Sequence, residues 1–229
     1  MFFRNNTLQC LILCLLFFTP VKFINAAQQT NSELVEFSLS IQNLTTDFKF
    51  PTRSYQVKMD QAGIRWYESL GEYFHAGLEV GYVDMSQIDN PLVSAQFSSG
   101  QFAGIRLRFL PYNQAHISVS LNLNYRYSKT KADGLSQESE FAWHETLFST
   151  EMELKPSNKV SLIVSAEYQD LAGEQRDSGN VSELTQFSNS KQQGYQVALN
   201  YKPYVNADIG IESFSGYRRG GGVYFRRKF

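Results

Sequence analysis

Apolar and polar residues alternate one by one along much of this chain. The longest such stretch runs from Ile117 to Tyr127, where odd positions are apolar or aromatic and even positions are polar. A helix would spread these apolar residues around its whole circumference, whereas a β-strand places them all on one face. The stretch exceeds the usual strand of about 5–6 residues and matches the roughly 9–11 residues that a tilted strand needs to cross a bilayer. The pattern therefore predicts membrane-spanning β-strands.

The same alternation recurs along the rest of the chain. It is regular in residues 35–42, 75–82, 103–109, 160–168, 195–201 and 207–212. Two other stretches are less regular. Between Tyr55 and Trp66 the apolar phase slips near Asp60–Gln61, which predicts a β-bulge. From Phe141 to Leu154 the phase is blurred, so the sequence predicts a strand there without fixing its facing.

The connections between these stretches alternate in length. Short turns rich in Pro, Asn and Gly lie at 69–71, 111–114, 155–158 and 202–206, while longer polar segments lie at 45–53, 86–100, 129–138 and 172–193, with a compact one at 216–222. Bacterial barrels place short turns in the periplasm and longer loops outside. We therefore predict an all-β fold, an antiparallel up-and-down transmembrane β-barrel of ten strands with both termini periplasmic. Eight strands is the alternative, if one of the irregular stretches is divided wrongly.

The N-terminus predicts a secretory signal peptide over residues 1–26. Arg4 supplies its positive region, Leu8–Phe18 its apolar region and Ala26 a small residue before the cleavage site. The apolar region is too short for a membrane-spanning helix. Residues 27–229 are then the outer-membrane β-barrel.

Composition excludes several function classes. The chain has 21 basic and 22 acidic residues, so no basic excess favours nucleic acid. Both cysteines, Cys10 and Cys14, fall in the predicted signal, which leaves no thiolate site. The histidines, His75, His116 and His144, lack metal-ligand spacing, and no phosphate-binding motif occurs. We expect no metal and no cofactor. The 13 tyrosines against 2 tryptophans suit the interfacial girdles of a barrel.

The last stretch, Val223–Phe229, carries Phe225 and Phe229 on one face. With the signal peptide and the alternating strands, it resembles the small Gram-negative outer-membrane β-barrel superfamily, which includes OmpA-type, opacity-type and omptin-type barrels. The resemblance covers the predicted barrel as a pattern. It implies contact with outer-membrane lipid and lipopolysaccharide, and it implies that the two phenylalanines are the signal read by the outer-membrane assembly machinery. Arg227 on the same face departs from the pattern, although a long side chain so near the strand end can reach the headgroups.

Many inward positions of the predicted barrel are charged. Counting from the short turns places three pairs on neighbouring strands at similar heights: Glu79 with Arg106, Arg126 with Glu145, and Asp208 with Arg226. Glu36 can reach Arg226 or Lys228 where the barrel closes. Buried charges need partners, and barrels of about eight strands have interiors filled by side chains. We interpret the charges as a polar plug that closes the lumen, with an ion pathway as the alternative.

Two enzyme hypotheses follow from the resemblance. Outer-membrane lipid A deacylases use a His-x-Ser pair similar to His116–Ser118, but here the pair lies at the predicted periplasmic end and no carboxylate follows on that strand. Omptin-type proteases use acidic residues and an Asp–His pair at the outer rim. The candidates for that site are His144, Asp84, Asp89, Asp133 and Asp170. No omptin motif accompanies them, so we expect no enzymatic activity.

The glycines Gly220–Gly222 predict a hairpin tip at the outer rim, where positive φ angles are needed. Their neighbours Arg218 and Arg219 are expected there as contacts to lipopolysaccharide phosphates. We expect a closed barrel with a structural, adhesive or partner-binding role through its outer loops or wall, the partner being an unidentified membrane protein. The alternatives are a narrow solute channel and an outer-membrane hydrolase.

Overall fold

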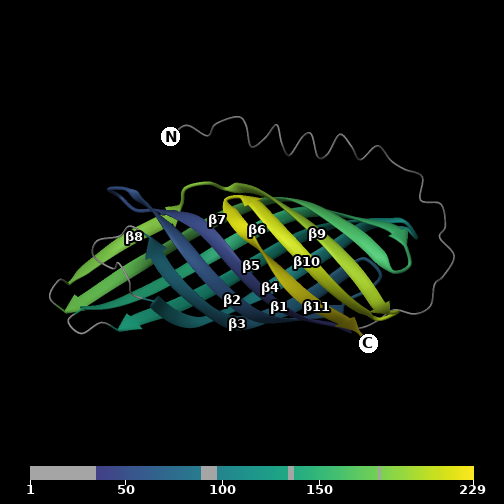
Figure 1. Cartoon of the computed structure of the whole chain (residues 1–229), viewed down its shortest axis with the longest axis horizontal. Helices are drawn as coiled ribbons and strands as arrows, with labels where there is room; N and C mark the ends of the chain where they lie inside the picture. Colours follow the sequence, from purple (N-terminus) through teal and green to yellow (C-terminus); the bar gives the residue numbers. More distant parts are fainter. Residues whose placement is uncertain (1–34, 89–96, 134–136, 180–181) are drawn as a thin grey trace. The chain divides into compact units, whose positions relative to one another are not determined.

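The computed structural model describes residues 35–88, 97–133, 137–179 and 182–229, which form one closed antiparallel sheet (Figure 1). The strands are β1 (Val35–Lys49), β2 (Ser54–Ser69), β3 (Phe74–Ile88), β4 (Phe97–Asn113), β5 (Ile117–Asp133), β6 (Gln137–Ser157), β7 (Val160–Gly179), β8 (Glu183–Asn189), β9 (Gln193–Tyr204), β10 (Ala207–Gly216) and β11 (Arg218–Lys228). The predicted signal peptide lies outside the described residues. Within the described ranges no helix is long and apolar enough to cross a membrane.

Ten of these strands form the ring, in the order β1 to β7 followed by β9, β10 and β11. The ring closes where β11 pairs with β1, from Glu36 opposite Lys228 to Thr46 opposite Arg218. The prediction of a ten-stranded antiparallel barrel is thereby confirmed, and the alternative of eight strands is wrong. The remaining strand, β8, lies outside this order and pairs with both β7 and β1.

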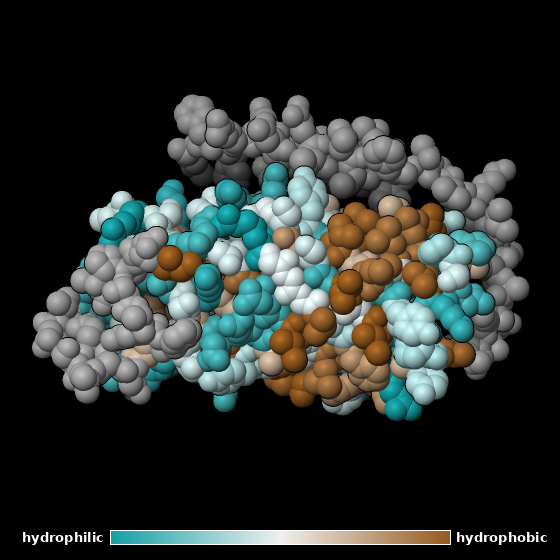
Figure 2. Space-filling model, viewed as in Figure 1, coloured by the Kyte–Doolittle hydropathy of each residue, from teal (hydrophilic) through white to brown (hydrophobic). Residues whose placement is uncertain are grey.

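An apolar belt surrounds the part of the barrel nearer the short turns. Its outward side chains are exposed although they are large and apolar, as in Leu39, Ile41, Leu78, Val80, Ile105, Leu107, Leu123, Val197, Leu199, Ile209, Ile211 and Val223. Figure 2 shows hydrophobic side chains gathered toward the right of the view, the side on which the chain ends in Figure 1, and hydrophilic ones toward β8 on the left. An exposed apolar surface of this extent is the band that lipid covers on a membrane barrel.

Strands β1 to β7 continue beyond the belt, where the outer face of the wall becomes polar and apolar side chains of β1, β2, β3 and β6 point into the lumen. We call this part of the barrel the extended end, and the opposite end the short-turn end. In β1, Leu39 and Ile41 point outward, whereas beyond Asn43 the apolar residues, Leu44 and Phe48, point into the lumen. The facing of each position is unchanged, because burial alternates regularly along the strand. Only the environments of the two faces have exchanged.

This inversion corrects the predicted bulge at Asp60–Gln61. The pairing of β2 with β1 and with β3 runs through these residues without a register shift. Ile64 points outward into the belt, while Val57 and Met59 point into the lumen of the extended end. The apolar phase therefore changes because the wall leaves the belt. The blurred stretch from Phe141 to Leu154 has the same cause.

Several segments predicted as loops are strand. β1 continues to Lys49, β5 and β6 cover most of 129–138, and 172–193 contains the end of β7 and all of β8. Outside the belt the outward face of a strand is polar, which gives these segments the composition of loops. The turn of the last hairpin lies at Gly216–Tyr217, and Gly220–Gly222 belongs to β11, where Gly220 has a positive φ of 135°. The predicted segment 86–100 lies partly outside the described residues.

Candidate functional site: a lumen in two layers

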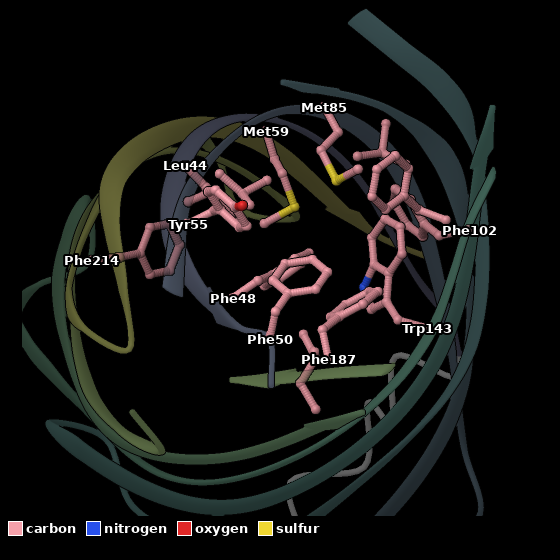
Figure 3. Close-up of a cluster of buried hydrophobic side chains, with 14 residues drawn as sticks. Leu44, Phe48, Phe50, Tyr55, Met59, Met85, Phe102, Trp143, Phe187 and Phe214 are labelled. Atoms are coloured by element: carbon pink, nitrogen blue, oxygen red, sulfur yellow. The ribbon is translucent and has the colours of Figure 1, made fainter. Parts of the chain in front are cut away.

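The lumen of the extended end holds an apolar cluster. Its side chains come from both sides of the ring and from β8: Leu44, Phe48, Phe50, Tyr55, Val57, Met59, Val83, Met85, Phe102, Phe141, Trp143, Leu171, Phe187 and Phe214. Figure 3 shows the labelled members pointing toward one another inside the circle of strands. None leaves more than 9% of its surface exposed. This cluster is not among the features predicted from the sequence, because polar side chains were expected along the whole lumen.

Aromatic rings hold the centre of the apolar cluster. Phe48 is fully buried, and its ring stacks on that of Phe187 at 4.6 Å between centroids. It meets Trp143 edge-on at 6.1 Å, and Phe50 contacts Phe187 at 5.3 Å. Offset and edge-on ring pairs contribute about 0.5–1.5 kcal/mol each beyond burial. The extended end therefore has a packed core like that of a small soluble barrel.

Between the apolar cluster and the short-turn end lies a polar cavity of about 100 Å³, enough for several waters. Arginines and glutamates line it in equal number: Arg65, Arg106, Arg108, Arg126, Arg218, Arg226, Glu36, Glu79, Glu145, Glu151, Glu167 and Glu212. The cavity is thus lined by balanced charge.

The structure brings together each of the three charge pairs named from the sequence. Arg106 Nη1 lies 2.8 Å from Glu79 Oε2, Arg226 Nε lies 2.8 Å from Asp208 Oδ2, and Arg126 contacts Glu145 directly. Each pair joins neighbouring strands, and Arg126 lies opposite Glu145 in the register. Local counting from the turns was sufficient to find such pairs.

Other lumen contacts span larger distances in the sequence. Glu36, expected to meet Arg226 or Lys228, pairs with Arg108 at 3.4 Å across the lumen. Glu212 accepts a hydrogen bond at 2.6 Å from the amide of Gln42, which is 170 residues away in the sequence. It accepts a second one at 2.8 Å from Gln196 on the neighbouring strand. A carboxylate held by neutral amides keeps its hydrogen bonds without a cation. Such contacts depend on the curvature of the ring, which the strand pattern alone does not give.

Arg218 corrects the prediction of a contact with lipopolysaccharide. It points into the lumen, where its Nη2 lies 2.9 Å from Glu167 Oε1 and its guanidinium lies over the Phe214 ring. Tyr217 also turns inward and donates to Glu167 at 2.7 Å, and burial raises the pKa of its hydroxyl. The early turn at Gly216 is the reason, because it makes Arg218 the first residue of β11. Arg219 remains exposed, 3.4 Å from Asp47.

The His116–Ser118 pair is not assembled as a catalytic site. His116 is exposed, and its Nδ1 lies 3.3 Å from the Lys155 carbonyl oxygen. Ser118 is buried in the wall and donates to Glu153 Oε2 at 3.2 Å. In this part of the described chain no hydrogen bond joins the histidine to the serine.

The omptin-type candidates are also dispersed. His144 is exposed on the outer wall, with its ring 6.4 Å from that of Tyr125. Asp170 is exposed, and Asp84 accepts a hydrogen bond from Ser99. The side chains of Asp89 and Asp133 lie outside the described residues. Among the residues that are described, no group of three or more His, Cys, Asp or Glu side chains could hold a metal ion.

The two phenylalanines expected as an assembly signal lie on the outer face of β11. Phe225 is 38% and Phe229 62% exposed. The Phe229 amide donates to the Val35 carbonyl at 2.9 Å, and the Arg227 guanidinium lies 4.9 Å from the Phe229 ring. The end of β11 is therefore paired with β1, and its aromatic face is accessible.

Comparison with known proteins gives a fold. No family model and no curated protein matches the sequence. Among solved structures, the outer-membrane protease OmpT from Escherichia coli is similar with a TM-score of 0.54 and 10% identity over 86% of this chain and 97% of that one. An outer-membrane channel from Pseudomonas putida F1 gives 0.47 with 8% identity over 86% and 95%. The attachment invasion locus protein Ail of Yersinia pestis gives 0.38 with 12% identity over 84% and 96%.

At 10% identity, the likeness to OmpT shows the fold alone. The chain has that fold in its strand order, its closure and its apolar belt. It is a closed, ten-stranded transmembrane β-barrel.

Proposed function

We propose that this protein is a closed, non-enzymatic outer-membrane barrel that binds a partner protein through its extended end. The observation that carries the proposal is the apolar cluster. It occupies the lumen at the level where the outer wall becomes polar. A channel for hydrated solutes needs a continuous polar path, whereas these aromatic side chains exclude water.

The orientation follows the rule for bacterial barrels, with the short-turn end and both termini in the periplasm. The extended end then stands among the lipopolysaccharide sugars and above them. Arg219 is suited to an exterior phosphate, since half of its side chain is exposed. During biogenesis, Phe225 and Phe229 would present the aromatic face of β11 to the assembly machinery.

A narrow solute channel is the second candidate. The polar cavity favours the channel, because charged side chains can be hydrated and so admit water more easily than an apolar core does. The apolar cluster would then be the single barrier, and it would have to move for solute to pass.

Planar-bilayer recordings test the closed barrel. The purified, unmodified protein is expected to give no steady conductance. Replacing Phe48, Trp143 and Phe187 together by alanine should produce openings, because it removes the rings at the centre of the apolar cluster. The matched control replaces the belt residues Leu78, Val80 and Ile105. Steady conductance from the unmodified barrel would favour the channel.

Partner binding is tested in cells by photo-crosslinking. A photoreactive amino acid is placed at outward positions of the extended end, such as Lys58 and Lys129, and at the outward belt position Leu123 as a control. A protein crosslinked from the extended end and absent from the control is the expected result. No crosslink from any position on the extended end would contradict the proposed function.

A further inference from the structure

Strand β8 has one edge that is only partly paired. Along one side it pairs with β7 from Glu183 to Ser188. Along the other it meets β1 at only two positions, with Asn189 opposite Phe48 and Ser188 opposite Lys49. Figure 1 shows β8 and the β1–β2 hairpin separating toward the extended end. The edge of β8 from Glu183 to Phe187 therefore continues past the last strand residue of β1.

The hydrogen bonding fixes which backbone groups this edge presents. The Ser190 amide donates to the Asp47 carbonyl of β1 at 3.1 Å. Successive residues of a strand direct their N–H and C=O groups to opposite sides. The groups of Ser188, Gln186 and Leu184 hence point the same way as those of Ser190, away from β7. Those of the residues between them serve the ladder with β7.

Nothing in β1 lies opposite Leu184 and Gln186. β1 ends at Lys49, and the Phe50 amide donates to the Arg53 carbonyl at 2.9 Å, which turns the chain back into β2. Within the described ranges, no hydrogen bond involves the backbone N–H or C=O of Leu184 or Gln186. This short edge thus offers two donors and two acceptors.

The side chains of the edge are also distinctive. Leu184 is 56% exposed on the outer wall. The tyrosines Tyr82, Tyr127 and Tyr168 mark the outer limit of the belt. Beyond them, no other described residue has a large apolar side chain that is exposed. Gln186 beside Leu184 is exposed too. Natural edges are usually protected by charged side chains, proline or a bulge. Glu183 is the one charged residue of this edge, and no proline or bulge lies between it and Phe187.

We propose that the free edge of β8 is the docking strand for an extended segment of a partner protein. The segment adds to the sheet beside β8, forming backbone hydrogen bonds with Leu184 and Gln186 and placing an apolar side chain against Leu184. In strand addition the backbone bonds supply affinity and alternate side chains supply selectivity. This inference rests on the proposed partner-binding function and names its surface.

A second copy of this chain does not fit the edge. Antiparallel pairing of two β8 edges requires a two-fold axis perpendicular to the barrel wall, and such an axis lies in the membrane plane. It would invert one barrel relative to the other, which two proteins in one membrane cannot adopt. A two-fold axis along the strands would set identical groups level with each other, whereas parallel pairing needs a stagger. We therefore assign this edge to a segment of a different protein.

The experiment uses short linear peptides displayed on phage and selected against the purified full barrel in nanodiscs. Selected peptides are synthesised, and their binding is measured by fluorescence anisotropy against the unmodified barrel, Gln186→Pro and Gln186→Ala. Proline removes the N–H that points away from β7 and adds a ring at the edge, so the ladder with β7 is kept. Alanine is the matched control, because it keeps the N–H.

We expect binding to Gln186→Pro to weaken by at least about tenfold, the loss of one hydrogen bond together with a steric clash. Binding to Gln186→Ala should stay within about twofold. Methylating alternate amides of the peptide should weaken binding similarly. A heat-modifiable folded band confirms that each variant is a barrel. Peptides that bind Gln186→Pro as tightly as the unmodified barrel would overturn the inference.

Failure of this inference is distinguishable from failure of the proposed function. If photo-crosslinks form elsewhere on the extended end while Gln186→Pro changes nothing, partner binding stands and the β8 edge is not its site. If no position on the extended end crosslinks, the proposed function itself fails.

Discussion

Removing one ring from the apolar cluster should cost a large part of the stability of the extended end. Phe48→Ala deletes a fully buried side chain that stacks on Phe187 and meets Trp143 edge-on. Such truncations cost about 3–5 kcal/mol, the larger values occurring where the neighbours cannot collapse into the space. The neighbouring rings belong to β6 and β8, whose backbones are paired with β7 in the sheet, so we expect about 4 kcal/mol. That is roughly a thousandfold change in the unfolding equilibrium.

The assay is urea unfolding of the barrel refolded in lipid vesicles, followed by tryptophan fluorescence. Its control is Lys49→Ala, which changes the next residue of β1, on the exposed outer wall. Surface changes of this kind usually stay within about 0.5 kcal/mol. If the two variants shift the urea midpoint equally, the apolar cluster is not a packed core and does not close the lumen.

Two further predictions concern the polar cavity and the last strand. Arg126→Ala leaves the Glu145 carboxylate without its cation and should cost about 3–5 kcal/mol of stability in the same unfolding assay. Adding Glu145→Gln should recover part of that loss, and a double variant no more stable than the single one would contradict the pairing. Phe229→Ala should lower the yield of the heat-modifiable folded band in cells. Its control, Val205→Ala, changes a turn residue that is 98% exposed and should lower the yield less. Equal yields would remove Phe229 from the proposed assembly signal.

The lipid-facing wall was predictable from sequence because its signal is local. From Ile117 to Tyr127 every second residue faces lipid, and the structure places this stretch in β5 with that facing. The pair Arg126–Glu145 was predictable for the same reason, since neighbouring strands joined at the extended end place them opposite each other.

The apolar cluster was not predictable from the sequence, because the same change in apolar phase can have two structural causes. An apolar phase that slips near Asp60 arises either from an extra residue or from a change of surroundings, and alternation alone does not separate them. The structure has the second cause, and with it the apolar cluster. Arg108 and Glu36 meet only because the ring closes at a particular stagger, which depends on all ten strands together.

The inversion of wall polarity also fixes how deep the protein sits in a bilayer. If the extended end sank into the bilayer, outward Asp47 and Lys49 would enter hydrocarbon, which costs up to about 2–4 kcal/mol for a basic side chain near the midplane. If it rose, Leu39 and Ile41 would meet water at about 25 cal/mol per Å². On β2 and β3 too, polar outward residues beyond the belt resist entry into hydrocarbon, and apolar outward residues of the belt resist exposure to water. A thinner or thicker membrane must therefore deform around the barrel instead of letting it slide. Strand β8 is consequently held at a constant distance from the hydrocarbon layer.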